Sequence, residues 1–262
     1  MLLDFYKYEG AGNDFILLDD RTGNFPLRNH DLIRRLCDRR FGIGADGLIL
    51  LQSVPACDFN MVYYNADGKE STMCGNGGRC IAAFARKLGI ISRQTRFMAA
   101  DGEHIAEIKT GNLIRLRMSD VSDIESDHDY YYLNTGSPHY VVFAERVKNL
   151  DVFREGRMIR NSARFNAEGT NVNFVEDFGE YLLVRTYERG VENETMACGT
   201  GVVAAVICSY LKRKSDSLTY VMPVKVPGGH LAVSLVRKDN AFTDIWLEGP
   251  ATYVFSGQIE LK

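Results

Sequence analysis

The sequence lacks the features that mark disulfide-rich, membrane-spanning or nucleic-acid-binding proteins. Its six cysteines in 262 residues are too few for a disulfide scaffold, and none forms a Cys-x-x-Cys pair. No run approaches the roughly 18 apolar residues of a membrane span, and residues 1–20 lack the basic start and apolar stretch of a signal peptide. A net charge of −3 gives no bias toward nucleic acid or anionic membranes. We therefore expect a cytoplasmic protein with reduced thiols and a small-molecule partner.

Motifs for several common chemistries are also missing. The five histidines show no His-Glu-x-x-His motif and no i, i+4 pair, so no metal is expected. Residues 42–47 satisfy Gly-x-Gly-x-x-Gly, but no strand precedes them and a strand-like segment follows, which is the wrong context for a dinucleotide. No serine stands in Gly-x-Ser-x-Gly. We accordingly expect no cofactor.

Two segments around cysteines share residue order as well as composition. They are Glu70-Ser-Thr-Met-Cys-Gly-Asn-Gly and Glu194-Thr-Met-Ala-Cys-Gly-Thr-Gly. The cysteines are Cys74 and Cys198, and the same 61 positions separate Asn13 from Cys74 and Ser137 from Cys198. Matching order and spacing over such a span indicate an internal duplication.

The duplication predicts an α+β fold of two pseudo-symmetric domains, residues 1–119 and 120–250, with residues 251–262 able to complete either one. Strands are expected at 15–19, 48–52, 59–64, 105–109 and 114–118, and at 140–143, 172–175, 181–187, 231–235 and 244–247. Helices at 79–88 and 202–211 are apolar or small on nearly every side, which suits a central helix wrapped by a curved, mostly antiparallel sheet. A helix at 31–39 is amphipathic and expected to be external.

Both cysteines are expected beside helix starts, where unpaired backbone N–H groups and the helix dipole favour negative charge. That field lowers the pKa of a thiol and also lets a carboxylate dock on the amides of Gly75 and Asn76, or Gly199 and Thr200. Inverting an amino-acid α-carbon without a cofactor needs one acid–base group on each face of the carbon, and a duplicated domain supplies two like groups. The pattern therefore predicts a two-thiol racemase or epimerase, with its active site in the cleft between the domains.

Most free cysteines are small buried side chains, and Cys37, Cys57, Cys80 and Cys208 are interpreted in that way. The matched register favours catalysis for Cys74 and Cys198 alone. From another class of function, a thiol redox switch or a non-catalytic binding module remains open.

The whole chain closely resembles diaminopimelate epimerase, a pyridoxal-independent isomerase family that interconverts LL- and meso-diaminopimelate in lysine and peptidoglycan precursor synthesis. The motifs that carry the resemblance include Gly12-Asn-Asp-Phe15, Tyr64-Asn-Ala-Asp-Gly68, Met73-Cys-Gly-Asn-Gly-Gly-Arg-Cys80, Tyr187-Glu-Arg-Gly190 and Ala197-Cys-Gly-Thr-Gly201. The resemblance implies that Cys74 and Cys198 are the two bases and that the protein is a homodimer.

The resemblance also assigns substrate-binding residues. By position these are Asn13, Asn65, Gly75, Asn76, Asn171, Glu188, Arg189, Gly199 and Thr200. Ser137 stands where many members have asparagine, so its direct contact is in question, and His139 could support the site or serve a structural hydrogen bond. The nearest rival functions are those of proline or hydroxyproline racemases and phenazine-type isomerases. Glu188 and Arg189 favour a substrate with a second charged amino-acid head.

Overall fold

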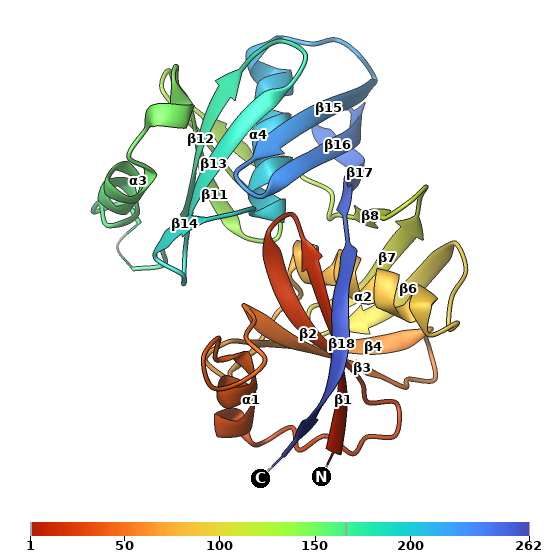
Figure 1. Ribbon diagram of the computed structural model, residues 1–262. Helices are drawn as coiled ribbons and strands as arrows, with labels where there is room; N and C mark the ends of the chain where they lie inside the picture. Colours follow the sequence, from red (N-terminus) through yellow and green to blue (C-terminus); the bar gives the residue numbers. More distant parts are fainter. Residues whose placement is uncertain (1, 166, 262) are drawn as a thin grey trace. The chain divides into compact units, whose positions relative to one another are not determined.

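The computed structural model describes residues 2–165 and 167–261. The chain divides into two compact units, Met1–Leu116 with Gly249–Lys262, and Arg117–Glu248 (Figure 1). The C-terminal strand β18 (Thr252–Glu260) pairs antiparallel with β1 (Leu2–Gly10), so this end of the chain belongs to the first unit.

The first unit is a sheet in the spatial order β18, β1, β2, β3, β4, β6, β7, β8. Neighbouring strands are antiparallel except β2 with β3 and β4 with β6, which are parallel, and the short β5 pairs with β4. The strands are β2 (Asn13–Asp19), β3 (Gly47–Gln52), β4 (Phe59–Asn65), β5 (Glu70–Ser71), β6 (Gln94–Ala99), β7 (Gly102–Ile108) and β8 (Leu113–Arg117).

The second unit repeats this plan in the order β9, β10, β11, β12, β13, β15, β16, β17. Here β11 with β12 and β13 with β15 are parallel, the other pairs are antiparallel, and the short β14 pairs with β13. The strands are β9 (Ile124–Ser126), β10 (Tyr131–Asn134), β11 (Pro138–Phe143), β12 (Asn171–Asp177), β13 (Leu182–Glu188), β14 (Asn193–Thr195), β15 (Thr219–Val226), β16 (Gly229–Lys238) and β17 (Ala241–Pro250).

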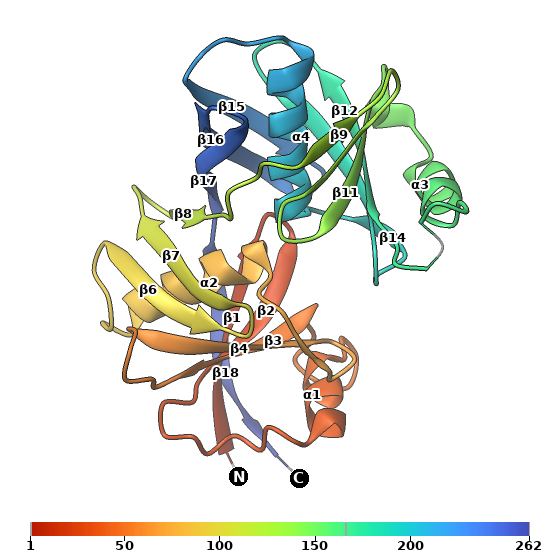
Figure 2. The same cartoon turned by 180° about the vertical axis from the view of Figure 1, so that it is seen from behind.

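One helix fills the concave side of each sheet. These are α2 (Gly75–Lys87) in the first unit and α4 (Gly199–Lys212) in the second, and the sheet curves around each of them (Figures 1 and 2). Nearly every residue of α4 is buried, as expected for a helix that is apolar on all sides. In α2, a Cβ added to Gly77 would lie 3.0 Å from Ile49 Cδ1, so the glycine lets this helix approach β3 closely. The predicted α+β class with a central helix in each half is confirmed.

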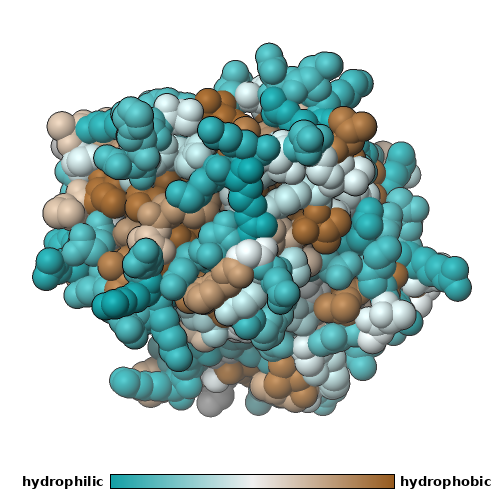
Figure 3. All heavy atoms as spheres, turned by 90° about the horizontal axis from the view of Figure 1, so that it is seen from above, coloured by the Kyte–Doolittle hydropathy of each residue, from teal (hydrophilic) through white to brown (hydrophobic). Residues whose placement is uncertain are grey.

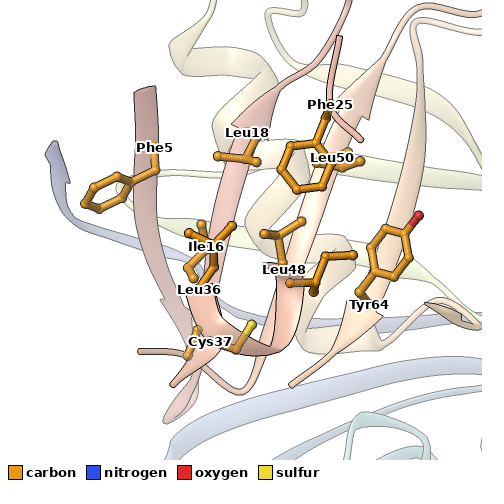
Figure 4. Packing of buried hydrophobic residues seen from close by; sticks show 11 residues of the cluster. Phe5, Ile16, Leu18, Phe25, Leu36, Cys37, Leu48, Leu50 and Tyr64 are labelled. Carbon is orange, nitrogen blue, oxygen red and sulfur yellow. The ribbon is translucent and has the colours of Figure 1, made fainter. Parts of the chain in front are cut away.

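A second, amphipathic helix covers the outer face of each sheet. In the first unit α1 (His30–Cys37) buries Ile33, Leu36 and Cys37 against Ile16, Leu18, Leu48 and Leu50 of β2 and β3 (Figure 4). In the second unit α3 (Val152–Arg160), preceded by a single 3₁₀ turn (Val147–Asn149), buries Val152 against Val172 and Tyr187. Strands that lie between the inner and outer helices, such as β3 and β12, are therefore buried on both faces, which explains the continuous apolar run of β3.

Both central helices begin earlier than the sequence predicts, at Gly75 and Gly199 rather than at residues 79 and 202. The external helix ends at Cys37 instead of residue 39. Within the described residues, no helix is long and apolar enough to cross a membrane. Hydrophilic side chains predominate on the face shown in Figure 3, with hydrophobic ones in separate groups among them.

Candidate active-site residues in two half-sites

The strand pairing brings the predicted site residues of the first unit to one edge of its sheet. Strands β2 and β3 are parallel and begin at Asn13 and Gly47, and the antiparallel β4 ends at Asn65, opposite Gly47. In the second unit the equivalent edge holds Ser137 just before β11, Asn171 at the start of β12 and Glu188 at the end of β13. We call these two groups, with the cysteine of each unit, the first and second half-sites.

Cys74 and Cys198 are the N-cap residues of α2 and α4, each with extended backbone angles. The first helical hydrogen bonds run from Gly78 N to Cys74 O at 2.7 Å and from Val202 N to Cys198 O at 2.9 Å. The N–H groups of the first turn therefore have no carbonyl partner inside the helix and carry the positive end of its dipole. This environment suits both a thiolate and a bound carboxylate.

In the first half-site, a network of side-chain amides surrounds the thiol. Asn13 Oδ1 accepts from Cys74 Sγ at 3.7 Å and from Asn76 Nδ2 at 3.3 Å. Asn13 Nδ2 donates to Asp46 at 2.6 Å, while Asn76 Oδ1 accepts from Arg79 at 2.9 Å. The structure thus joins Asn13, Cys74 and Asn76 directly through their side chains.

Beneath Asn13 lies a cluster of charges. Asp14 pairs with Lys7 and with Arg39, both at 2.6 Å, and Arg39 also pairs with Asp46 at 2.8 Å. Burial alone would raise the pKa of Asp14, but the bonds to Arg39 and Lys7 outweigh it and hold that pKa well below its usual value. The cluster fixes the start of β2 and, through Asp46, the side chain of Asn13.

Asn65 is exposed at the end of β4 and lies outside the hydrogen-bond network of the first half-site. Its backbone N–H donates to Lys69 O at 2.9 Å, which closes the turn between β4 and β5. Within the described residues its side chain has no hydrogen-bond partner, so the amide is available to a ligand.

The second half-site joins three of its predicted residues around one hydroxyl. Ser137 Oγ accepts from Asn171 Nδ2 at 2.9 Å and from Arg189 Nη2 at 3.4 Å. Asn171 Oδ1 accepts from the backbone N–H of Arg189 at 2.9 Å. Glu188 is half-buried and accepts from Thr195 Oγ1 at 2.8 Å, and burial raises its pKa. Ser137 therefore contacts the residues expected to bind substrate.

Cys198 belongs to a separate chain of contacts in the same unit. Its Sγ lies 3.5 Å from Thr200 Oγ1, and His139 Nε2 lies 2.9 Å from the same hydroxyl. Asn173 Nδ2 lies 3.0 Å from His139 Nδ1. Burial, together with the charge of Arg189, lowers the pKa of His139 to about 3, so the imidazole is neutral at physiological pH.

Asp46 and Asn173 were not among the predicted site residues, although both bond to residues that were. Asp46 ends the run Arg40-Phe-Gly-Ile-Gly-Ala-Asp46, and Asn173 lies two positions after Asn171 on β12. Alternation along a strand places Asn171 and Asn173 on one face, so a period-two reading could have found the second asparagine.

The remaining four cysteines lie outside the two half-sites. Cys37, Cys80 and Cys208 are buried, and burial raises the pKa of each thiol, to about 12 for Cys37. The half-buried Cys57 bonds Glu103 at 3.6 Å. Over residues 2–165 and 167–261, no three His, Cys, Asp or Glu side chains cluster in a way that could hold a metal ion.

Comparison with known proteins identifies the family. The family model described as diaminopimelate epimerase matches residues 5–122 and 131–254. The chain belongs to the diaminopimelate epimerase family. A family member from Flavobacterium psychrophilum is 50% identical over 258 residues, which cover 98% of this chain and 100% of that protein. Another, from Chlorobaculum tepidum, is 44% identical over 260 residues, 96% of this chain and 99% of the relative.

Solved structures outside the diaminopimelate epimerase family share its fold. A phenazine biosynthesis protein of the PhzF family from Bacillus anthracis matches with a TM-score of 0.74 at 14% identity, over 100% of both chains. A probable proline racemase from Agrobacterium radiobacter matches with a TM-score of 0.72 at 14% identity, over 99% of this chain and 93% of that one. At such low identity these likenesses concern the fold alone.

Proposed function

We propose that the protein interconverts LL- and meso-diaminopimelate by moving a proton to and from the α-carbon with Cys74 and Cys198. The observation that carries this proposal is the repeated placement of a cysteine as N-cap of a buried, glycine-started helix. The choice of diaminopimelate as substrate follows from membership of the diaminopimelate epimerase family.

The chemistry follows from those two helix starts. A thiolate on one face of the α-carbon takes the hydrogen, and the electron pair of the broken C–H bond spreads into the carboxylate. Amides at Gly75, Asn76, Gly199 and Thr200 stabilise that charge, because unpaired helix N–H groups favour an anion. The second thiol then gives its proton to the opposite face and becomes the thiolate. One hydrogen leaves, one arrives, and the centre is inverted without a cofactor.

The proposal requires both half-sites to act on one substrate molecule in a cleft between the two units. Asn13, Asn65 and Asn171 would hold the ammonium and carboxylate groups, since amides both donate and accept. Glu188 and Arg189 would bind the distant amino-acid head, with the guanidinium gripping a carboxylate through two parallel bonds. Ser137 and His139 would support that arrangement.

Deuterium incorporation tests the substrate and the reaction together. Incubation of the pure protein with LL-diaminopimelate in deuterium oxide should place deuterium at one α-carbon of the product. A proline racemase would instead label proline, and labelling of proline alone would overturn the substrate assignment. The discriminating feature is Arg189, which a second charged head needs and a proline ring does not.

Cysteine substitutions test the two-thiol mechanism. Cys74→Ser and Cys198→Ser should each lower epimerisation by at least about a hundredfold, because the far higher pKa of serine makes it a poor base. Cys57→Ser, at a half-buried cysteine outside both half-sites, serves as the matched control and should retain activity. Near-normal turnover by either of the first two variants would refute the assignment.

We further propose that the protein is a cytoplasmic homodimer. A mechanism with one thiolate and one thiol needs both sulfurs in the reduced state, which a reducing compartment maintains. Tyr253, Val254 and Phe255 of β18 are 40–51% exposed, an apolar stretch that a second copy would cover. Light scattering after gel filtration should give twice the chain mass of 29.5 kDa. A monomer at micromolar concentration would exclude the dimer.

A further inference from the structure

Hydrogen bonds in the first unit fix which atom of Asn13 faces the catalytic sulfur. Its Nδ2 lies 2.6 Å from Asp46 Oδ2, and a carboxylate only accepts, so the nitrogen must stand on that side. Its Oδ1 therefore faces Cys74 Sγ at 3.7 Å. The sulfur of Cys74 lies against an acceptor, which an S–H group can satisfy and a thiolate cannot.

A second contact confirms this orientation of the amides. Asn76 Nδ2 donates to the same Asn13 Oδ1 at 3.3 Å. The other end of Asn76, Oδ1, accepts from Arg79 Nη2 at 2.9 Å, and a guanidinium only donates. Arg79 and Asp46 thus hold the two amides from both ends, and neither amide can reverse without losing a charged partner.

In the second unit the hydrogen bonds run in the opposite direction, so that a donor rather than an acceptor lies beside the catalytic sulfur. Asn173 Nδ2 lies 3.2 Å from the carbonyl of Tyr140, which only accepts, so its nitrogen stands there and also faces His139 Nδ1 at 3.0 Å. Thr186 Oγ1 donates to Asn173 Oδ1 at 2.9 Å and holds the other end. His139 Nδ1 must therefore accept, and in a neutral imidazole the N–H is then on Nε2.

This tautomer determines the direction of the next bond. His139 Nε2–H donates to Thr200 Oγ1 at 2.9 Å, so the hydroxyl proton is not used in that bond, and Cys198 Sγ lies 3.5 Å from the same oxygen. Thr200 can therefore donate to the sulfur of Cys198, and a hydrogen bond donated to the sulfur stabilises a thiolate. A Cβ on Gly201 would lie 2.3 Å from Asn173 Oδ1, which shows how closely α4 packs on this chain of contacts.

Charges around the two networks agree with this difference. In the first unit three cations and three anions surround the Asn13 network, so their net charge is zero: Lys7, Arg39 and Arg79 with Glu9, Asp14 and Asp46. In the second unit the positive charge of Arg189 acts on His139, and burial raises the pKa of the neighbouring Glu188. The helix-start field is common to both cysteines, so the difference lies in the side chains that contact each sulfur.

We propose that in the free enzyme the proton shared by the catalytic pair resides on Cys74 and that Cys198 is the thiolate. Asp46 and Asn173 are the positioning residues that set this polarity, the former through Asn13 and the latter through His139 and Thr200. The inference rests on the proposed function, because it assigns the starting roles of base and acid to the two thiols. Protonation of each sulfur is nevertheless measurable without substrate.

The test is the pH dependence of alkylation by iodoacetamide, followed for each cysteine by peptide mass spectrometry. The midpoint of each rate profile reports thiolate formation and is independent of how accessible the sulfur is. The Cys198 midpoint should lie about one pH unit or more below that of Cys74, since a hydrogen bond to a charged group has about that effect.

Variants test the two positioning networks separately. Thr200→Val should raise the Cys198 midpoint by about one pH unit without moving that of Cys74, and Thr200→Ser should restore it. Asn173→Ala should move the Cys198 midpoint the same way, because both imidazole tautomers become available. Asp46→Asn, which lets the Asn13 amide reverse, should lower the Cys74 midpoint instead.

Thr95→Val is the matched control, because this buried hydroxyl bonds Asp58 at 2.8 Å, and both midpoints should stay unchanged. A Cys74 midpoint at or below that of Cys198 overturns the inference, as does a Thr200→Val profile identical to wild type. If Thr200→Val does not fold, the opposite shifts from Asn173→Ala and Asp46→Asn decide. Correct midpoints in a protein that fails to epimerise diaminopimelate would refute the proposed function and leave the protonation assignment standing.

Discussion

Arg189 is held in place before any substrate arrives. Its guanidinium donates to Ser137 Oγ at 3.4 Å and to the carbonyl of Glu168 at 3.1 Å, and its backbone N–H is fixed by Asn171. The side chain is nevertheless exposed, so its remaining donors can reach a ligand. A planar fork already oriented by neighbours loses less entropy when it binds a carboxylate.

Replacement of the planar guanidinium of Arg189 by the single ammonium group of lysine should weaken substrate binding more than it slows catalysis. Arg189→Lys is expected to raise KM for diaminopimelate about 10- to 100-fold with a smaller change in kcat, because one charge-assisted bond is lost in ground and transition states alike. Steady-state kinetics measure both constants. Arg34→Lys, at an exposed arginine paired with Asp31 on α1, is the matched control. An unchanged KM would remove Arg189 from the substrate site.

Motifs in the sequence were enough to nominate the cysteines, the amides and the Glu188–Arg189 pair, because residue type and spacing are local properties. The sequence could not supply the partners of those residues. Asn173 is linked to Cys198 only through His139 and Thr200, and these residues meet by parallel pairing of β11 with β12 and by packing of α4. Such relations depend on the folded sheet.

At the scale of elements, all ten predicted strands overlap observed strands. Eight strands and the helix α3 were not predicted; the strands are β1, β5, β6, β9, β10, β14, β15 and β18. Strand β1 was not predicted because the inward-facing Lys7 breaks the apolar alternation of its sequence. The ion pair of Lys7 with Asp14, which allows the lysine to be buried, exists only in the folded unit. The predicted starts of the central helices are too late because glycines have low helix propensity. In the structure, packing and the N-cap cysteine place these glycines inside the first turn of each helix.

Gly156 explains why α3 was missed and gives a test of that helix. Glycine to alanine normally stabilises a helix by about 1 kcal/mol, but here the new Cβ would lie 2.3 Å from Cβ of Tyr187 on β13. Gly156→Ala should therefore lower the free energy of unfolding by about 1–3 kcal/mol, as overpacking does. Urea denaturation measures it, and Met158→Ala, 65% exposed on the same helix, should change stability by less than about 0.5 kcal/mol. A more stable Gly156→Ala protein would show that α3 can shift away from the sheet.

At the scale of the whole molecule, the duplication preserves topology more faithfully than sequence. Each unit pairs its strands in the same alternation of antiparallel and parallel neighbours, with one helix inside the sheet and one outside. This plan puts two strand starts and one strand end at the same edge as the N-terminus of the inner helix. Side chains at the three strand positions can diverge, as Asn13 and Ser137 have, while the cysteine at the helix N-terminus is kept.

Buried titratable groups predict how stability of the whole chain depends on pH. Ion pairs lower the folded-state pKa of Asp14 and Asp177, the latter through Arg213, so below about pH 4 the unfolded chain binds more protons and stability falls as pH falls. Burial raises the pKa of Cys37, Cys80 and Cys208, so above about pH 8.5 the unfolded chain releases protons that the folded chain keeps. Stability must then fall as pH rises, by up to about 1.4 kcal/mol per pH unit for each thiol.

Cys208 isolates one contribution to the alkaline limb, because burial is the cause of its raised pKa. The measurement is urea titration under reducing conditions between about pH 8.5 and 10. The free energy of unfolding of Cys208→Ala should fall less steeply with pH than that of wild type, by up to about 1.4 kcal/mol per pH unit. Cys57→Ala, at a half-buried thiol, should keep more of the wild-type slope, because the pKa of Cys57 is raised whereas that of Cys208 is raised well above its usual value. Parallel alkaline limbs for wild type and Cys208→Ala would mean that the thiol inside α4 ionises in the folded protein, which a side chain wholly enclosed by the sheet should not do.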